Sequence, residues 1–78
     1  IRIMKITNGS KKRCREKFPY KGISKIIEIA CEVIEFDPEI AIAECIYDHS
    51  DNQMYNVMLF LLKENYNKKE LDKFDYIL

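Results

Sequence analysis

Apolar residues recur at helical spacing from residue 23 onwards, and this spacing is the clearest structural signal in the chain. The i, i+3, i+4, i+7 rule of an amphipathic helix is met by Ile23, Ile26, Ile27, Ala30, Val33 and Ile34. The opposite face carries three acidic residues, Glu28, Glu32 and Glu35. The pattern therefore predicts a helix with one apolar stripe, beginning at Ile23.

The sequence Asp37-Pro38-Glu39 is typical of a helix start. Aspartate is a favoured N-cap, proline fits the first helical position, and glutamate in the first turn interacts favourably with the helix dipole. We therefore predict a second helix from Pro38 to about Tyr47. The isoleucine alternation that follows the cap would also suit a strand, but the cap and the alanines favour a helix.

A third apolar stripe follows a polar break at residues 48–52. Its Leu and Met content favours helix over strand, and its members are Met54, Val57, Met58, Leu61 and Leu62. Ser50 followed by Gln53 fits a capping box at its start. Asn67 with Glu70 is a second cap signal and predicts a last short helix. We expect the buried side of that helix to hold Leu71, Phe74 and Leu78.

The first 22 residues give weaker signals. Three isoleucines between basic residues suggest an extended segment, and Thr7–Ser10 reads as a turn. Residues 11–17 suit either a short helix or an irregular segment, and Pro19 and Gly22 interrupt the chain before the first clear helix. We therefore predict an all-α fold: a basic N-terminal arm over 1–22, a compact three-helix bundle over 23–65, and a C-terminal helical extension over 66–78.

The net charge of zero hides a strong division along the chain. Residues 1–25 hold nine basic groups against Glu16 alone, a charge of +8, whereas residues 26–62 hold eight acidic groups and no Lys or Arg, a charge of −8. The division is typical of a basic arm on an acidic body. Two interpretations remain open: the arm docks on the body or stays solvated, or one of the two poles holds a partner.

The length and composition exclude several classes of protein. A chain of 78 residues forms one domain at most, and 47% apolar with 33% charged residues suits a compact fold rather than disorder. The longest apolar run, Val57–Leu62, is far shorter than the roughly 20 residues that span a bilayer. Three widely spaced cysteines do not form a disulfide framework. We expect an intracellular protein, in the cytoplasm or nucleus, that does not insert in a membrane.

Few residues offer catalytic or metal-binding chemistry. Cys45 and His49 lie four residues apart, as a thiolate nucleophile and its base could, but no Gly-rich loop accompanies them. No Cys-x₂-Cys pair is present to build a usual zinc site, and the acidic break lacks the Gly and the last Glu of a calcium loop. We therefore expect no enzyme, no metal and no cofactor, with the cysteines serving as small core residues.

A basic run in the predicted arm is the best signal for nucleic-acid binding. Clustered cations displace counterions from phosphates, and Phe18 and Tyr20 could stack on bases. The run consists of Lys11, Lys12, Arg13, Arg15 and Lys17. The acidic remainder of the chain would repel a nucleic acid lying across it, so this function is an alternative.

The order of helices and turns over residues 23–64 resembles the ubiquitin-associated and CUE-like families of three-helix domains. Ile34-Glu35-Phe36 stands at the first turn, Asp51-Asn52 at the second, and Leu61-Leu62 closes the third helix. Glu35 replaces the turn glycine of the ubiquitin-associated pattern. The resemblance implies a protein partner, with ubiquitin as the first candidate, whose apolar patch rimmed by basic groups would be bound by Ile34, Glu35, Phe36, Leu61 and Leu62.

Two alternatives accompany this resemblance. Phe36 and Leu61 would also serve as core residues of so small a bundle. The C-terminal extension is more apolar than a free tail would be, which suggests self-association or pairing with a larger partner. Its apolar residues, which would otherwise cap the small core, are Tyr66, Phe74, Tyr76, Ile77 and Leu78.

Overall fold

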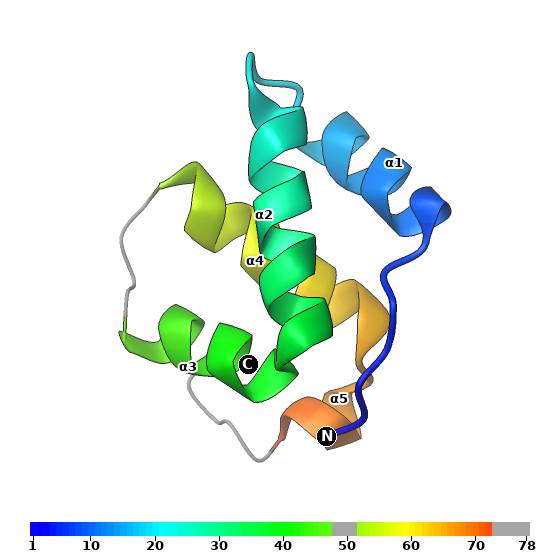
Figure 1. The fold of residues 1–78 in the computed structure, drawn as a ribbon, viewed down its shortest axis with the longest axis vertical. Helices are drawn as coiled ribbons and strands as arrows, with labels where there is room; N and C mark the ends of the chain where they lie inside the picture. Colours follow the sequence, from blue (N-terminus) through cyan, green and yellow to red (C-terminus); the bar gives the residue numbers. More distant parts are fainter. Residues whose placement is uncertain (48–51, 73–78) are drawn as a thin grey trace.

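The computed structural model describes residues 1–47 and 52–72, and in these residues every regular element is a helix (Figure 1). The elements in chain order are α1 (Asn8–Lys17), α2 (Ile23–Phe36), α3 (Pro38–Tyr47), α4 (Gln53–Asn65) and α5 (Lys68–Leu71). The prediction of an all-α fold is confirmed. Phe74, Tyr76, Ile77 and Leu78, predicted to pack on the last helix or to self-associate, lie outside the described residues.

The helices α2 and α4 form the centre of the molecule, and α1 and α3 each pack against both of them (Figure 1). The predicted apolar stripes supply the core, because a helix buries the side on which its apolar residues recur. Three leucine and isoleucine side chains from these stripes, Ile34, Leu61 and Leu62, have no exposed surface. Ile26 and Val33 of the same stripe lie at its edge and are half-buried.

The corner between α2 and α3 follows the predicted cap. Asp37 ends α2 with its N–H donating to the carbonyl of Val33, and its carboxylate accepts from the N–H of Glu39 at 3.0 Å. Pro38 is the first residue of α3. One aspartate therefore satisfies backbone groups of both helices, which fixes the sharp change of direction between them.

The start of α4 differs from the prediction. Its N-cap is Asn52, whose side chain accepts from the N–H of Tyr55 at 2.7 Å, so the expected cap at Ser50 is wrong by two residues. Ser50 itself lies outside the described residues. The predicted cap of the last helix is confirmed, since Asn67 and Glu70 form a reciprocal capping box before Leu71, which is buried.

The first 22 residues form part of the packed unit. A helix, not an irregular segment, covers the basic run, and it begins earlier than expected because the Thr7 hydroxyl caps it on the N–H of Ser10. Ile6, Ser10 and Cys14 are buried against the rest of the molecule. The N-terminal segment therefore docks on the rest of the described chain: Lys11 pairs with Glu28 of the acidic stretch, and Arg2 and Arg13 pair with Glu70 and Glu64 beyond it. The alternative that one pole also holds a partner stays open.

Gly22 allows α1 and α2 to join at a tight turn. It is the N-cap of α2 and has φ +80°, a left-handed conformation that costs glycine little because it has no Cβ. The chain thereby reverses over a few residues, and α2 runs back across the molecule beside α1 (Figure 1).

Candidate functional site

The five residues that the family resemblance implies for partner binding do not share a surface. Ile34, Leu61 and Leu62 are fully buried, so in this conformation they present nothing to a partner. Glu35 is half-buried and its carboxylate accepts from the backbone N–H of Ile6 at 2.8 Å. Phe36 alone projects, with 79% of its surface exposed. The alternative of a core role holds for Leu61 and is wrong for Phe36.

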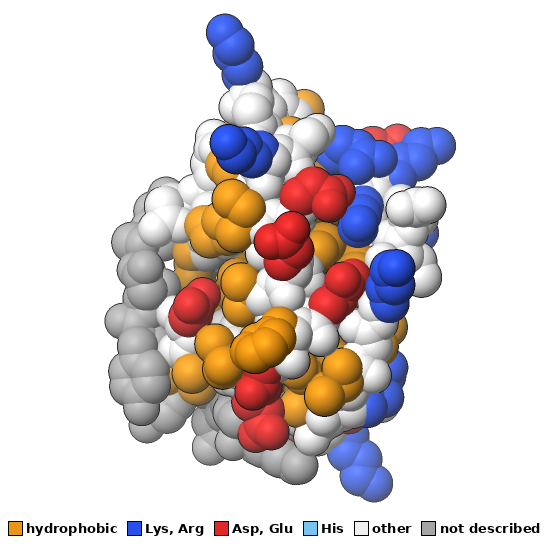
Figure 2. All heavy atoms as spheres, viewed as in Figure 1, with side chains coloured by type: hydrophobic (Ala, Val, Ile, Leu, Met, Phe, Trp, Pro, Cys, Tyr) orange, Lys and Arg blue, Asp and Glu red, His pale blue; other side chains and the backbone are white. Residues whose placement is uncertain are grey.

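Phe36 is part of a larger exposed apolar face. Ile29, seven residues earlier on α2, is 41% exposed, and a spacing of seven residues brings two side chains to the same side of a helix. Ile40 in the first turns of α3 is 43% exposed. We call these three residues, Ile29, Phe36 and Ile40, the α2–α3 face. Figure 2 shows apolar side chains gathered beside α2 and continuing towards α3.

This face lies on the side of α2 that is remote from α1. The α1 side is marked by two glutamates, since Glu28 pairs with Lys11 of α1 and Glu35 holds Ile6 in the segment before it. Ile29 and Phe36 lie roughly a third of a helical turn away from these glutamates. Half-buried Val33 lies between the exposed stripe and the core, so the apolar surface of α2 is continuous from inside to outside.

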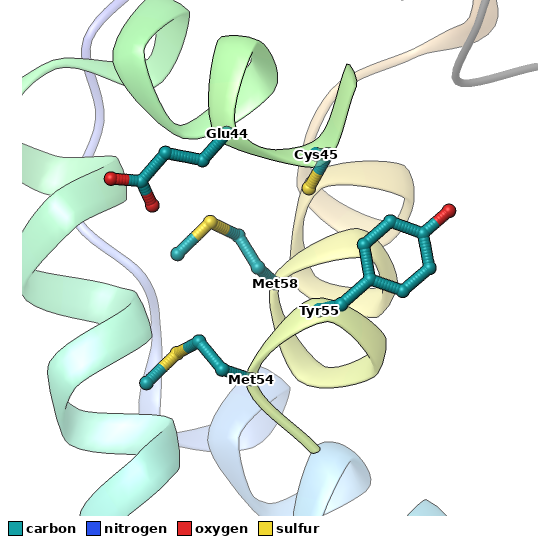
Figure 3. A pocket seen from close by; sticks show the side chains of 5 residues that line it. All are labelled: Glu44, Cys45, Met54, Tyr55 and Met58. Atoms are coloured by element: carbon teal, nitrogen blue, oxygen red, sulfur yellow. The ribbon is translucent and has the colours of Figure 1, made fainter. Parts of the chain in front are cut away.

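A small pocket lies between α3 and α4 (Figure 3). Its lining residues are Glu44, Cys45, Met54, Tyr55 and Met58. The volume of about 30 Å³ would take one or two water molecules, whereas pockets for small-molecule substrates hold roughly 300–1,000 Å³. The pocket is therefore a dent in an apolar surface, and its methionines can change shape to fit a side chain that enters.

Acidic side chains without internal partners surround this side of the molecule. Among the described residues, Glu32, Glu39 and Glu44 take part in no ion pair, whereas Glu28, Glu64 and Glu70 pair with basic residues of the N-terminal segment. Within residues 26–62 the sequence has no Lys or Arg that could neutralise them. Lys25, one turn before Ile29, marks the end of the acidic region.

The three cysteines are buried and free, which confirms their interpretation as small core residues. Desolvation raises the pKa of the thiols of Cys14, Cys31 and Cys45 from 9.0 to about 11. A reactive or metal-binding cysteine needs the opposite shift, because the thiolate is the reactive form. No cluster of three or more His, Cys, Asp or Glu suited to a metal occurs in the part of the chain described, and His49 lies outside it.

Some side chains of the basic run form ion pairs within the molecule, and the others are exposed to solvent. Arg13 contacts Glu64 of α4 at 2.9 Å and Lys11 contacts Glu28 at 3.6 Å. The basic side chains with no ion pair to a described residue are Lys12, Arg15 and Lys17, and they lie exposed on α1. Figure 2 shows cations grouped over α1. Phe18 packs edge-on against Phe60 with ring centres 5.8 Å apart, which leaves only Tyr20 as an exposed aromatic beside the run.

Comparison with known proteins finds no matching family model, no similar curated protein and no similar solved structure. The resemblance to ubiquitin-associated and CUE-like domains therefore rests on the residue pattern alone. No helix in residues 1–47 and 52–72 is long and apolar enough to cross a membrane.

Sequence reasoning missed Ile29, Ile40 and Glu44 as surface residues of interest. A signal for Ile29 was present, because an isoleucine between Glu28 and Glu32 falls outside the stripe that the helix buries. Nothing comparable distinguished Ile40, which stands among the apolar residues of α3, several of which are buried. Recognising the α2–α3 face required knowing on which side of α2 the other helices pack.

Proposed function

We propose that this chain is a non-catalytic protein-recognition domain that binds its partner through the α2–α3 face. The observation that carries the proposal is the exposure of Phe36, the most exposed large apolar side chain of the described residues, two helical turns from exposed Ile29. Large aromatic side chains dominate the energetics of many protein interfaces, where they fill pockets on the partner. Contiguous exposed apolar residues rimmed by polar ones mark interaction sites more often than solvated surface.

The chemistry of the described residues supports a non-catalytic role. The buried thiols are held in their protonated form, and the pocket beside the face is too small to enclose a substrate. Ubiquitin remains the first candidate partner from the family resemblance. If it binds, it contacts Phe36 and the neighbouring exposed residues rather than the buried leucines of α4, and the free glutamates face its basic rim.

The first test is a heteronuclear NMR titration of the labelled chain with monoubiquitin. We expect shifts at Ile29, Phe36 and Ile40, and loss of those shifts in Phe36→Ser. Tyr20→Ser is the matched control, because Tyr20 is also an exposed aromatic (52%) but lies at the α1–α2 turn. Circular dichroism should show that both variants stay folded, since neither side chain is in the core.

A partner other than ubiquitin is tested by photo-cross-linking. Benzoylphenylalanine at position 36 should cross-link a specific protein in cells that express the chain, and the same probe at position 20 should not. Cross-linking that is equal at both positions, together with no shift by ubiquitin, would overturn the proposed function.

Nucleic-acid binding through α1 is the second candidate function. The exposed side chains of Lys12, Arg15 and Lys17 favour it, because they have no ion pair among the described residues and lie away from the free glutamates. Changing these three residues to Ala should abolish a salt-sensitive complex with short RNA or DNA and leave a complex at the α2–α3 face intact. Binding that persists in this triple variant would exclude the α1 site.

Self-association through the C-terminal extension has less support. Tyr66, one of the residues that suggested it, is 2% exposed, and its hydroxyl donates to the carbonyl of Arg2 at 2.8 Å. Tyr66 therefore caps the core and ties the N-terminal segment to it, as the alternative expected. The remaining apolar residues of the extension lie outside the described residues.

A further inference from the structure

One side of α3 joins the α2–α3 face to the pocket between α3 and α4, and we call the face and the pocket together the depression. On α2, the exposed stripe of Ile29 and Phe36 faces away from α1. On α3, Ile40 and Glu44 are four residues apart and share one side of the helix. From α4, Met54 and Met58 line the pocket together with Glu44, and Figure 3 shows these three side chains directed towards α2. The depression is thus apolar at its centre.

The rim of this depression has one sign of charge. Glu32 lies on α2 between the two exposed apolar residues, three residues after Ile29 and four before Phe36. Glu44 closes the α3 side, and Glu39 lies beside Ile40. None of these three carboxylates forms an ion pair with another described residue. A ligand that places cations around an apolar centre would neutralise charges that the fold leaves unneutralised.

We propose that the α2–α3 face, with its methionine pocket, binds a basic amphipathic helix of a partner protein. This inference rests on the proposed function and names the chemistry of its ligand. Two apolar residues of the ligand helix, one or two turns apart, lie against Ile29 and Phe36, which are two turns apart on α2. A third apolar residue of the ligand enters the pocket between Met54 and Met58. Lys and Arg residues of the ligand lie opposite Glu32 and Glu44.

Other occupants fit the charges less well. Nucleic acids and anionic membranes would be repelled by the three free glutamates. In a second copy of this chain the basic helix would be α1. The apolar side chain of α1, Cys14, is buried in its own core, so α1 has no apolar side to place on the face. The face therefore selects a cationic helix from another protein.

The test uses three synthetic peptides of about 14 residues, roughly four helical turns. The first places Leu at i, i+4 and i+7 among Lys residues, the second has Glu in place of every Lys, and the third keeps the composition of the first with the Leu residues scattered around the helix. Fluorescence anisotropy of labelled peptides measures binding to the full chain. We expect the first peptide to bind at least about tenfold more tightly than either of the others, with an affinity that falls as salt is raised.

Two charge-reversal variants locate the binding. Glu44→Lys should weaken the first peptide at least about fivefold, and Glu16→Lys should not, although both change the net charge of the chain equally. Glu16 is an exposed residue of α1 and makes no ion pair with a described residue. NMR shifts caused by the first peptide should include Ile29, Phe36, Glu44 and Met54. Circular dichroism checks that each variant is folded.

The outcomes separate this inference from the function on which it rests. Equal binding of the basic and acidic amphipathic peptides, both abolished by Phe36→Ser, would overturn the charge selectivity and leave the apolar recognition face. The inference would also be overturned if Glu44→Lys and Glu16→Lys weakened binding of the first peptide equally, or if the scattered peptide bound as tightly as the first. Either result would mean that the peptide binds by nonspecific charge attraction and not at the α2–α3 face. Failure of all three peptides would overturn it as well. The proposed function would then stand or fall on the cross-linking at position 36.

Discussion

Three glutamates share the polar face of α2 but have different neighbours. On the α1 side, Glu28 pairs with Lys11 and Glu35 accepts from the N–H of Ile6. Glu32 shares the polar face of α2 with these two residues but has no ion-pair partner among the described residues, and Ile29 and Phe36 farther from α1 are exposed. Glu28 and Glu35 thus hold the N-terminal segment in place, whereas Glu32 on the same helix has no ion pair with a described residue, because no basic segment packs beside it. The part of α2 that no described residue covers, with Glu32, Ile29 and Phe36, is the part with capacity to bind something else.

The largest expected effect separates the core of α2 from its exposed stripe. Ile34→Ala should lower the free energy of unfolding by about 2–5 kcal/mol, because it removes fully buried methyl groups and leaves a cavity. Phe36→Ala should change it by less than about 0.5 kcal/mol, because most of that ring is already in water. Urea denaturation measures both. A large loss with Phe36→Ala would show that the ring is packed and would remove the basis of the α2–α3 face.

Two glutamates three residues apart on the polar face of α2 provide the next contrast. Glu35→Ala removes the acceptor for the N–H of Ile6 and should cost about 1–3 kcal/mol, as for a partly buried donor left without a partner. Glu32→Ala removes an exposed carboxylate without an ion pair and should change stability by less than about 0.5 kcal/mol. Amide hydrogen exchange at Ile6 should accelerate only in the first variant. Equal losses would mean that the hydrogen bond from Ile6 to Glu35 does not set the two glutamates apart.

The buried thiols make stability dependent on alkaline pH. In the unfolded chain they ionise near 9.0, whereas burial raises the pKa of each to about 11 in the folded chain. Between these values the folded state retains protons that the unfolded state has released, so stability is full below pH 9 and falls as the pH rises to about 11. Thermal melting across this range measures the effect. Cys31→Ala should flatten the decline, and an unchanged decline would contradict this assignment.

The smallest expected effect concerns the ion pair that joins α1 to α2. Lys11 and Glu28 are 3.6 Å apart and the glutamate is largely exposed, so Glu28→Gln should cost no more than about 0.5 kcal/mol. Salt screens such a pair, and the difference from the parent chain should vanish in high salt. Denaturation at low and high ionic strength provides the comparison. A loss that survives high salt would indicate packing by the side chain rather than charge.

The helix pattern could be predicted from local features, and the candidate site could not. Ser50 and Asn52 are both good caps by residue type, and the sequence alone did not show that Asn52 caps α4. The family resemblance selected Phe36 together with Leu61 and Leu62, which are alike in hydrophobicity, yet one is exposed and two are buried. Periodicity shows which residues share a side of a helix, but not whether another helix covers that side.

The amino-acid sequence by itself determined the helices over 23–36 and 38–47, the corner at Asp37 and the capping box at Asn67, because each depends on residues within one or two turns. Only the tertiary structure decided that the basic N-terminal segment docks, with Arg13 on Glu64 and Glu35 on Ile6, and that Ile29 and Phe36 remain uncovered. These outcomes depend on contacts between residues far apart in the chain. Such contacts form where packing and charge pairing together are most favourable, and local propensity carries no information about that choice.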